Sequence, residues 1–294
     1  MKKKLTALGI ILISITIMLS GCKKTQNKTT GDTKVNSDTN DISSVYESDN
    51  QSDNASDLMD SGYIKLPKPE NLTDWRTHPQ DYKLIALTFD DAPAFDSAEN
   101  NYTRTIIDTL TDYEGRATLF VIGNSVVKNG EALLKYAVSR GFELGNHSFS
   151  HTALGSLSAD ECENEVADCS LIIKGIAGKE PLFFRPPYLS VGDGLLQTTE
   201  ALGICPVLMS INTYDYEAKT TAEQIVDRVV KNAKNGSVVL LHSKYEVTAK
   251  AIKPLCDALY KQNYRFCTLH ELFYFTGNEY IPTSATVSCA DVRH

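Results

Sequence analysis

The 294-residue sequence has no Lys- and Arg-rich patch beyond three lysines near its start, and its formal net charge is −8. Nucleic-acid backbones are bound by clustered basic side chains, so nucleic acid is excluded as a partner. Tryptophan occurs once, at Trp75, in a Pro-flanked segment where we expect it to pack rather than to bind a ligand. No short internal repeat is present, which excludes a repeat architecture.

The longest apolar run, residues 5–19, is shorter than the roughly 20 residues that a membrane-spanning helix needs. It follows Lys2–Lys4 and leads into "LSGC", which resembles the lipobox of bacterial lipoproteins. In such proteins cleavage precedes the Cys, which then carries a diacylglyceryl group. We therefore predict a lipoprotein signal peptide at residues 1–21 and a lipid anchor at Cys22. An uncleaved amino-terminal membrane helix is the alternative.

The composition of the chain divides it into further segments. Residues 22–62 are rich in Ser, Thr, Asn and Asp, too polar to form a core, and are predicted to be a disordered, lipid-anchored linker. A lead-in segment at 63–81, one large domain at 82–276 and a tail at 277–294 follow. We expect a monomer whose domain lies outside the cytoplasm, anchored to the outer face of the cytoplasmic membrane.

Strand-like and helix-like segments alternate after Tyr82. The predicted strands are 84–89, 117–122, 142–144, 182–184, 204–209, 238–241 and 266–269. Helix starts are indicated by capping boxes at Ser158/Glu161 and Thr220/Glu223, and helix ends by Gly115, Gly141 and Gly236. This alternation predicts an α/β fold with parallel strands and right-handed crossovers, either an open sheet or a barrel of about seven units.

Polar residues cluster at the carboxyl ends of these strands, where α/β proteins collect their reactive groups. Asp90 and Asp91 follow the first strand. His147 and His151 follow the third and, if their loop is helical or tightly turned, can face one metal ion together with a carboxylate. Surface or capping histidines are the alternative, but their alignment with the aspartates favours a metal site.

Five ordered motifs resemble those of the polysaccharide deacetylases, carbohydrate esterases of family 4 with a nodulation-protein-type domain. They are "TFDDAP", "HSFSH", "RPPY", "YDY" and "VVLLH", within roughly residues 80–275. The resemblance implies a distorted (β/α) barrel with fewer than eight units. It also implies a divalent metal centre, with zinc expected and cobalt or manganese possible, that removes acetyl groups from sugars.

The resemblance also implies roles for individual residues. Asp91, His147 and His151 would hold the metal, and Asp90 would be the base that takes a proton from the attacking water. Arg185 would orient Asp90 and keep it ionised. The backbone N–H of Tyr188 would stabilise the oxyanion. His242 would be the general acid, its pKa raised by Asp215, and Tyr188, Leu189 and Tyr216 would contact the sugar.

Four positions depart from the family pattern. Ala92 replaces the usual Gly after the aspartate pair, where we expect little harm because the following Pro93 favours an extended backbone that Ala tolerates. Leu189 replaces a Gly and would be strained if its φ angle were positive. Tyr216 and Asn212 replace the usual Trp and Asp. These changes bear on substrate preference and rate more than on reaction type.

Of the seven cysteines, Cys22 is assigned to the lipid. Cys162 and Cys169 share one face of a predicted helix, about 10 Å apart, so we expect them to pack in the core rather than to bridge each other. The remaining set could form disulfides in an exported protein: Cys205, Cys256, Cys267 and Cys289. His270, at the start of the last helix, is predicted to be a cap or a surface residue.

The sequence therefore predicts a metal-dependent hydrolase that removes N-acetyl groups from N-acetylglucosamine residues of peptidoglycan or chitin-like oligosaccharides. Two alternatives stay open. One is an O-deacetylase acting on acetylated xylan, which the same residues could perform. The other is a non-catalytic, sugar-binding surface protein, although such a protein has no need of a base, three metal ligands and a general acid together.

Overall fold

The computed structural model describes residues 63–94, 101–278 and 280–283. The predicted signal peptide, the lipid anchor at Cys22, the linker and Cys289 lie outside these residues. Within the described ranges, none of the helices combines the length and the apolar character needed to cross a membrane.

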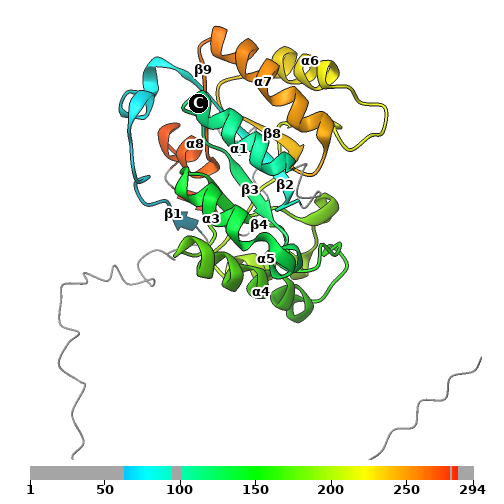
Figure 1. Ribbon diagram of the computed structural model, residues 1–294. Coiled ribbons are helices and arrows are strands. Elements are labelled where there is room, and N and C mark those ends of the chain that lie inside the picture. The colour runs from blue at the N-terminus through cyan, green and yellow to red at the C-terminus, as the bar shows by residue number, and fades with distance from the viewer. Residues whose placement is uncertain (1–62, 95–100, 279, 284–294) are drawn as a thin grey trace, which may run out of the picture. The chain divides into compact units, whose positions relative to one another are not determined.

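A curled parallel sheet forms the centre of the described domain (Figure 1). Its described strands pair in the order β6-β5-β4-β3-β2-β8-β7, and β9 pairs with the first residues of β2. The strands are β2 (Lys83–Ala92), β3 (Thr118–Val121), β4 (Glu143–Asn146), β5 (Phe183–Phe184), β6 (Cys205–Pro206), β7 (Ile211–Asn212), β8 (Ser237–His242) and β9 (Tyr264–Cys267). All these pairings are parallel, as predicted.

The two edge strands of the sheet, β6 and β7, are consecutive in the chain. Only residues 207–210 join them, so the sheet must curl until its edges approach each other. The curled sheet confirms the prediction of a distorted barrel. The prediction of a single strand at 204–209 was wrong, because the chain leaves β6 after two residues and starts β7 beside β8.

Helices cover the outside of the sheet (Figure 1). The described helices are α1 (Tyr102–Asp112), α2 (Gly123–Ser125), α3 (Glu131–Ser139), α4 (Ala159–Ala177), α5 (Asp193–Ala201), α6 (Ala222–Asn232), α7 (Glu246–Lys261) and α8 (Leu269–Phe275). Single helical turns lie at Asp74–Thr77, Pro79–Asp81, Val126–Gly130 and Pro187–Leu189. The helices α6, α7 and α1 pack in succession, as do α3, α4 and α5, so two helical groups flank the sheet.

Capping residues fix where the helices begin and end. The capping box at Ser158 and Glu161 opens α4 as predicted. The box expected at Thr220/Glu223 lies one residue later, at Thr221 and Gln224, and it opens α6. Gly141 follows α3 with φ 81°, a conformation that costs little without a Cβ atom.

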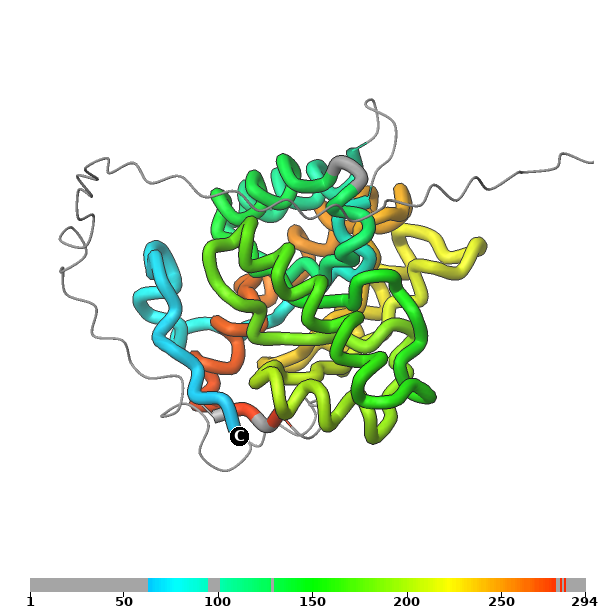
Figure 2. Tube along the Cα trace, turned by 90° about the horizontal axis from the view of Figure 1, so that it is seen from below, coloured from blue at the N-terminus to red at the C-terminus, as the bar shows by residue number. Residues whose placement is uncertain are grey.

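Strand β2 is the centre of the core, since every residue after Lys83 is buried. The lead-in segment packs against the same domain. Its strand β1 (Tyr63–Lys65) pairs antiparallel with β10 (Tyr280–Pro282), and Figure 2 shows the two ends of the described chain side by side. Trp75 is buried, which confirms its packing role.

Two expectations about cysteine and histidine are corrected. The described cysteines are all buried, and no disulfide joins Cys205, Cys256 and Cys267 to one another. Cys162 and Cys169 pack in the core as predicted. His270 lies in α8 but is not a surface residue: it is buried, and its Nε2–H donates to the carbonyl of Pro67, 2.7 Å away.

Candidate functional site

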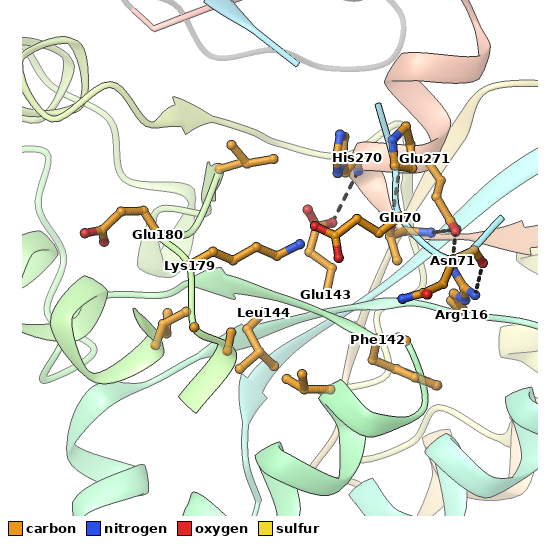
Figure 3. Close-up of a pocket in the computed structure, with 18 residues that line it drawn as sticks. Glu70, Asn71, Arg116, Phe142, Glu143, Leu144, Lys179, Glu180, His270 and Glu271 are labelled. Carbon is orange, nitrogen blue, oxygen red and sulfur yellow. Dashed lines mark hydrogen bonds and ion pairs between the residues drawn. The ribbon is translucent and has the colours of Figure 1, made fainter. Parts of the chain in front are cut away.

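One cavity lies at the amino ends of the strands and contains none of the predicted site residues (Figure 3). Several charged side chains of its lining are paired. Glu271 Oε1 lies 2.7 Å from both Arg76 Nε and Arg116 Nη1. Glu143 accepts from the Thr118 hydroxyl at 2.6 Å. These ion pairs and hydrogen bonds tie the lead-in segment and α8 to the sheet, which is a structural role.

A second cavity, of about 370 Å³, lies at the opposite, carboxyl ends of the strands. Most of the predicted site residues line it: Asp90, Asp91, His147, His151, Tyr188, Leu189, Tyr216 and His242. Arg185 and Asp215 are buried and hydrogen-bonded to two of these side chains. The structure therefore brings together every predicted site residue that it describes, and we call this space the strand-end cavity.

The two adjacent aspartates reach this cavity through an irregularity in β2. The strand pairs regularly with β8 as far as Asp90, opposite His242, but its register with β3 shifts between Phe89 and Ala92. Asp91 has φ 62°, the left-handed conformation that Asp tolerates better than most residues. Neighbouring side chains of a regular strand point to opposite faces, so this shift allows both carboxylates to face the cavity.

His147 is held in the form that a metal ligand requires. Its Nδ1 lies 2.6 Å from the carbonyl oxygen of Arg185. A carbonyl can only accept, so Nδ1 carries the proton, and Nε2 presents its lone pair toward Asp91 Oδ1, 3.6 Å away. Burial lowers the pKa of His147 and outweighs the neighbouring aspartates, which keeps the ring neutral.

His151 is placed by a tight turn rather than by a helix. Its backbone N–H donates to the Ser148 hydroxyl at 2.9 Å, and both residues have positive φ angles. The side chain of the buried Asn146 accepts from the N–H of Ser148 and donates to the carbonyl of Val166 in α4. The turn is thereby fixed to the core, and His151 Nε2 lies 3.1 Å from Asp91 Oδ1.

Asp91, His147 and His151 fit a divalent metal. Ligand atoms from the three side chains lie within 4.8 Å of one another. Asp91 Oδ1 is buried without a hydrogen-bond donor among the described residues, although both imidazole rings face it. A buried, unsatisfied carboxylate oxygen is costly, and a metal ion would satisfy it.

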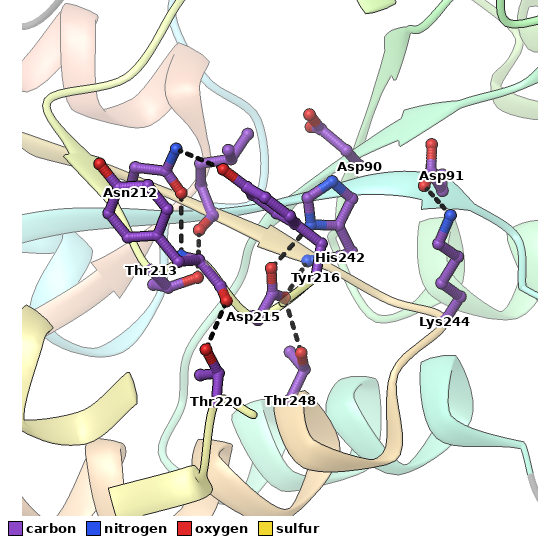
Figure 4. Close-up of polar contacts among 12 residues, drawn as sticks. Asp90, Asp91, Asn212, Thr213, Asp215, Tyr216, Thr220, His242, Lys244 and Thr248 are labelled. Carbon is purple, nitrogen blue, oxygen red and sulfur yellow. Dashed lines mark hydrogen bonds and ion pairs between the residues drawn. The ribbon is translucent and has the colours of Figure 1, made fainter. Parts of the chain in front are cut away.

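The second oxygen of Asp91 contacts a residue that was not predicted. Lys244 Nζ lies 2.7 Å from Asp91 Oδ2. Figure 4 shows this ion pair. Burial alone would raise the pKa of Asp91, but His151, His147 and Lys244 outweigh it and hold that pKa well below its usual range. Asp91 is therefore ionised, as a metal ligand must be.

Asp90 is oriented by the fully buried Arg185. Arg185 Nη1 donates to Asp90 Oδ1 at 2.9 Å and to the Thr88 hydroxyl at 2.6 Å, and Nη2 donates to the carbonyl of Leu208 at 2.8 Å. Asp90 Oδ2 lies 3.9 Å from His147 Nε2. One oxygen of Asp90 is thus fixed by the guanidinium, while the other faces the cluster of predicted metal ligands.

His242 and Asp215 form the other side of the cavity (Figure 4). Asp215 Oδ1 lies 2.8 Å from His242 Nδ1, and its Oδ2 accepts from the backbone N–H of His242 and from the Thr248 hydroxyl. Burial lowers the pKa of His242, but the hydrogen bond and charge of Asp215, with Asp90 and Asp91, raise it above its ordinary value. With Nδ1 bonded to Asp215, Nε2 is the nitrogen available to a substrate.

Tyr188 and Leu189 form a strained turn above the predicted metal ligands. Both have φ 56°, which is uncommon for residues with a Cβ atom. The strain anticipated for Leu in place of Gly is therefore present. The turn leaves Tyr188 72% exposed, and its ring centroid lies 4.8 Å from that of His151.

The other departures from the family pattern are accommodated. Ala92 remains buried in β2. The Tyr216 ring contacts the His242 ring edge-on, with centroids 5.5 Å apart. Asn212 accepts from the N–H of Tyr214, so it shapes the loop that presents Asp215.

Sequence reasoning missed three residues that support the site. Lys244 follows His242 by two residues, and this closeness along the chain was the one signal that it belongs to the site. Thr248 hydrogen-bonds Asp215 from α7, 33 residues away, and Asn146 precedes His147 as the last residue of β4. No local sequence pattern indicates the hydrogen bond between Thr248 and Asp215.

Residues 77–207 match the sequence profile of the polysaccharide deacetylases. A peptidoglycan-N-acetylglucosamine deacetylase of Bacillus cereus is 36% identical over 209 residues, which are 70% of this chain and 94% of that protein. A bifunctional xylanase/deacetylase of Pseudobutyrivibrio xylanivorans is 34% identical over 203 residues, which are 68% of this chain but only 32% of that longer protein.

The fold is also shared with solved structures. A family 4 acetyl xylan esterase from Clostridium thermocellum, in complex with a cobalt ion, superposes with a TM-score of 0.61 and 32% identity. The alignment covers 72% of this chain and 97% of that structure. The likeness thus extends over nearly the whole of a single deacetylase-type domain.

Proposed function

The chain belongs to the polysaccharide deacetylase family, and we propose that it is a metal-dependent hydrolase that removes N-acetyl groups from sugars. The substrates that we propose are N-acetylglucosamine residues of peptidoglycan or chitin-like oligosaccharides. The observation that carries this proposal is the single cavity in which Asp90, the three candidate metal ligands and His242 meet. The B. cereus relative, matched over nearly its full length, supports the choice of an N-acetylated sugar.

Asp91, His147 and His151 would hold the ion, expected to be zinc with cobalt or manganese as alternatives. Bound there, a divalent ion polarises the acetyl carbonyl and lowers the pKa of water. Cobalt in the Clostridium structure supports a divalent metal for this fold. The chain's own contribution is a neutral His147, an ionised Asp91 and a turn that fixes His151.

Asp90 would act as the general base. Arg185 holds one of its oxygens, so the other can accept a proton from a water attacking the acetyl carbon. The backbone N–H of Tyr188 would donate to the carbonyl oxygen as it gains negative charge. In this scheme Arg185 is a positioning residue, because it acts through Asp90.

His242 would act as the general acid from the opposite wall. Its Nε2 would donate a proton to the departing amine, while Asp215 stabilises the positive ring at Nδ1. An amine must be protonated to leave, and supplying that proton is the function that we propose for His242 and Asp215. Tyr188, Leu189 and Tyr216, which line the cavity, would contact the sugar ring.

The domain would work close to the membrane. Cys22 is proposed as the lipid anchor at the outer face of the cytoplasmic membrane. The predicted linker of about 40 residues would keep the domain near that face, since flexible chains of this length have a root-mean-square span of about 35 Å. Newly made peptidoglycan and soluble oligosaccharides lie within this range. Polymers outside the wall would seldom reach the site.

Acetate release from a small substrate panel tests the proposal. The purified, metal-loaded protein should release acetate from N-acetylchitotetraose or from peptidoglycan fragments and leave one free amine per acetate. Acetylated xylan is the control, because the Clostridium relative is an acetyl xylan esterase. Acetate from xylan alone would establish the O-deacetylase alternative, and no acetate from any substrate, with sugar still bound, would establish a binding protein.

A further inference from the structure

The turn that carries His151 is tied to helix α4 at Glu165. The backbone carbonyl of Glu165 accepts from the N–H of Phe149 at 2.9 Å. Its carboxylate accepts twice from Ser150: Oε2 from the backbone N–H at 2.8 Å and Oε1 from the hydroxyl at 2.6 Å. Glu165 thus accepts hydrogen bonds from both residues that directly precede His151.

The same chain of hydrogen bonds continues past His151. Ser150 Oγ lies 2.8 Å from the hydroxyl of Thr152. Because a carboxylate can only accept, the Ser150 hydroxyl gives its proton to Glu165. The Thr152 hydroxyl therefore donates to Ser150. In this way the residues on both sides of His151 are linked to one carboxylate of α4.

The turn needs such support because its backbone adopts an uncommon conformation. Ser148 has φ 65° and His151 has φ 63°. The left-handed region is costly for residues with a Cβ atom, so it persists only where surrounding contacts hold it. The hydrogen bonds to Glu165 lie between these two residues and on the side of the turn that faces α4.

The His151 ring depends on its backbone more than the His147 ring does. The His147 side chain is 3% exposed, and its Nδ1 donates to the carbonyl of Arg185. The His151 side chain is 24% exposed, and its Nδ1 has no hydrogen-bond acceptor among the described residues. Metal-binding histidines are usually oriented by an acceptor at the second ring nitrogen. Without one, the turn itself must direct the His151 ring.

We propose that Glu165 is a positioning residue for the metal centre, which acts by fixing the backbone of His151. The inference rests on the proposed function, which assigns His151 to the metal. Glu165 does not line the strand-end cavity, so it acts through the turn and not on the substrate. A ligand that is already fixed loses less conformational freedom when it binds an ion, which raises the affinity.

Two substitutions separate the reach of the Glu165 side chain from its charge. Glu165→Gln keeps the length, so its amide oxygen can accept from the Ser150 N–H and its amide nitrogen can donate to the Ser150 hydroxyl oxygen. Glu165→Asp keeps the charge but is one methylene shorter and cannot make both hydrogen bonds. Zinc affinity is measured in competition with a chelator. We expect Glu165→Asp to bind zinc about tenfold more weakly than wild type, and Glu165→Gln to stay within about twofold.

Glu163→Asp and Glu163→Gln are the matched controls. Glu163 is exposed on the same helix, and no hydrogen bond or ion pair joins its side chain to another described residue. Both variants should bind zinc as wild type does. Thermal unfolding of the metal-free proteins is measured alongside, and Glu165→Asp should unfold at the same temperature as Glu163→Asp.

A double-mutant cycle tests whether Glu165 acts through His151. In protein that carries His151→Ala, Glu165→Asp should cost no further zinc affinity, because the ligand that it positions has been removed. Acetate release offers a second measurement: at saturating zinc, Glu165→Asp alone should recover to within about twofold of wild type. A loss of about tenfold in zinc affinity in the His151→Ala background would overturn the inference.

The remaining outcomes each decide the role of Glu165. Equal losses in Glu165→Gln and Glu165→Asp would assign the effect to charge, and no loss in Glu165→Asp would show that the turn holds itself. A metal-free Glu165→Asp protein that unfolds below Glu163→Asp would assign Glu165 to the stability of the fold. Each of these results would overturn the inference while zinc binding and acetate release by wild type keep the proposed function. Wild type that binds no zinc would overturn the proposed metal centre itself.

Discussion

The Asp90→Asn variant is expected to lose turnover by about 10²–10⁴-fold while still binding metal. Asparagine keeps the size of the side chain but cannot accept the proton of the attacking water. The three side chains that we propose bind the metal are separate from it, since Asp90 Oδ1 faces Arg185 and Asp91 Oδ1 faces the two imidazoles. Rates of acetate release and metal content per chain measure the two effects.

Asp91→Asn is the matched control for this experiment. It makes the same chemical change one residue later, in a side chain that we assign to the metal. We expect metal affinity to fall by more than about tenfold, with activity partly recovered by excess metal. Equal metal content and equal activity in the two variants would contradict the division of roles between the neighbouring aspartates.

His242→Ala is expected to slow release of acetate from N-acetylated sugars by about 10²–10⁴-fold. The effect on an O-acetylated substrate should be much smaller, because an alcohol needs less help from an acid to leave than an amine does. Parallel assays on N-acetylchitotetraose and on acetylated xylan measure the difference. The same loss on both substrates would contradict protonation of the amine as the role of His242.

The dependence of activity on pH gives His242 a second test. Asp215 raises the pKa of His242, so the acid stays protonated to a higher pH than an ordinary imidazole would. Replacing Asp215 by Asn should lower that pKa and shift the alkaline limb of the kcat/KM profile to lower pH. An alkaline limb that does not move would show that it reports another group.

The order of strands and helices was predictable because each parallel strand is a short apolar run bounded by helix caps. The exception was the region after β6. Residues 204–209 read as one strand, but β6 ends at Pro206 and β7 begins at Ile211 on the other edge of the sheet. This break depends on closure of the sheet, which brings Ser210 N–H to the carbonyl of Val238, a contact between distant segments.

The sequence predicted those site residues that have a suitable side chain and also lie at the end of a predicted strand. Polar residues at successive strand ends meet in space because parallel strands end at the same edge, and this placed Asp90, His147 and His242 together. The irregularity in β2 that turns the Asp91 side chain into the cavity depends on pairing with β3. The sequence could therefore indicate that both aspartates face the site, but not the irregularity that places them there. Lys244 and Thr248 were missed because their partners are fixed by tertiary packing.

Metal titration tests the central claim most directly. The protein is stripped with a chelator and zinc or cobalt is added back in steps, while bound metal and acetate release from N-acetylchitotetraose or peptidoglycan fragments are followed together. We predict no turnover without metal, and a rate that rises in proportion to bound metal until one ion per chain is reached. Full activity in the metal-free protein would contradict the account.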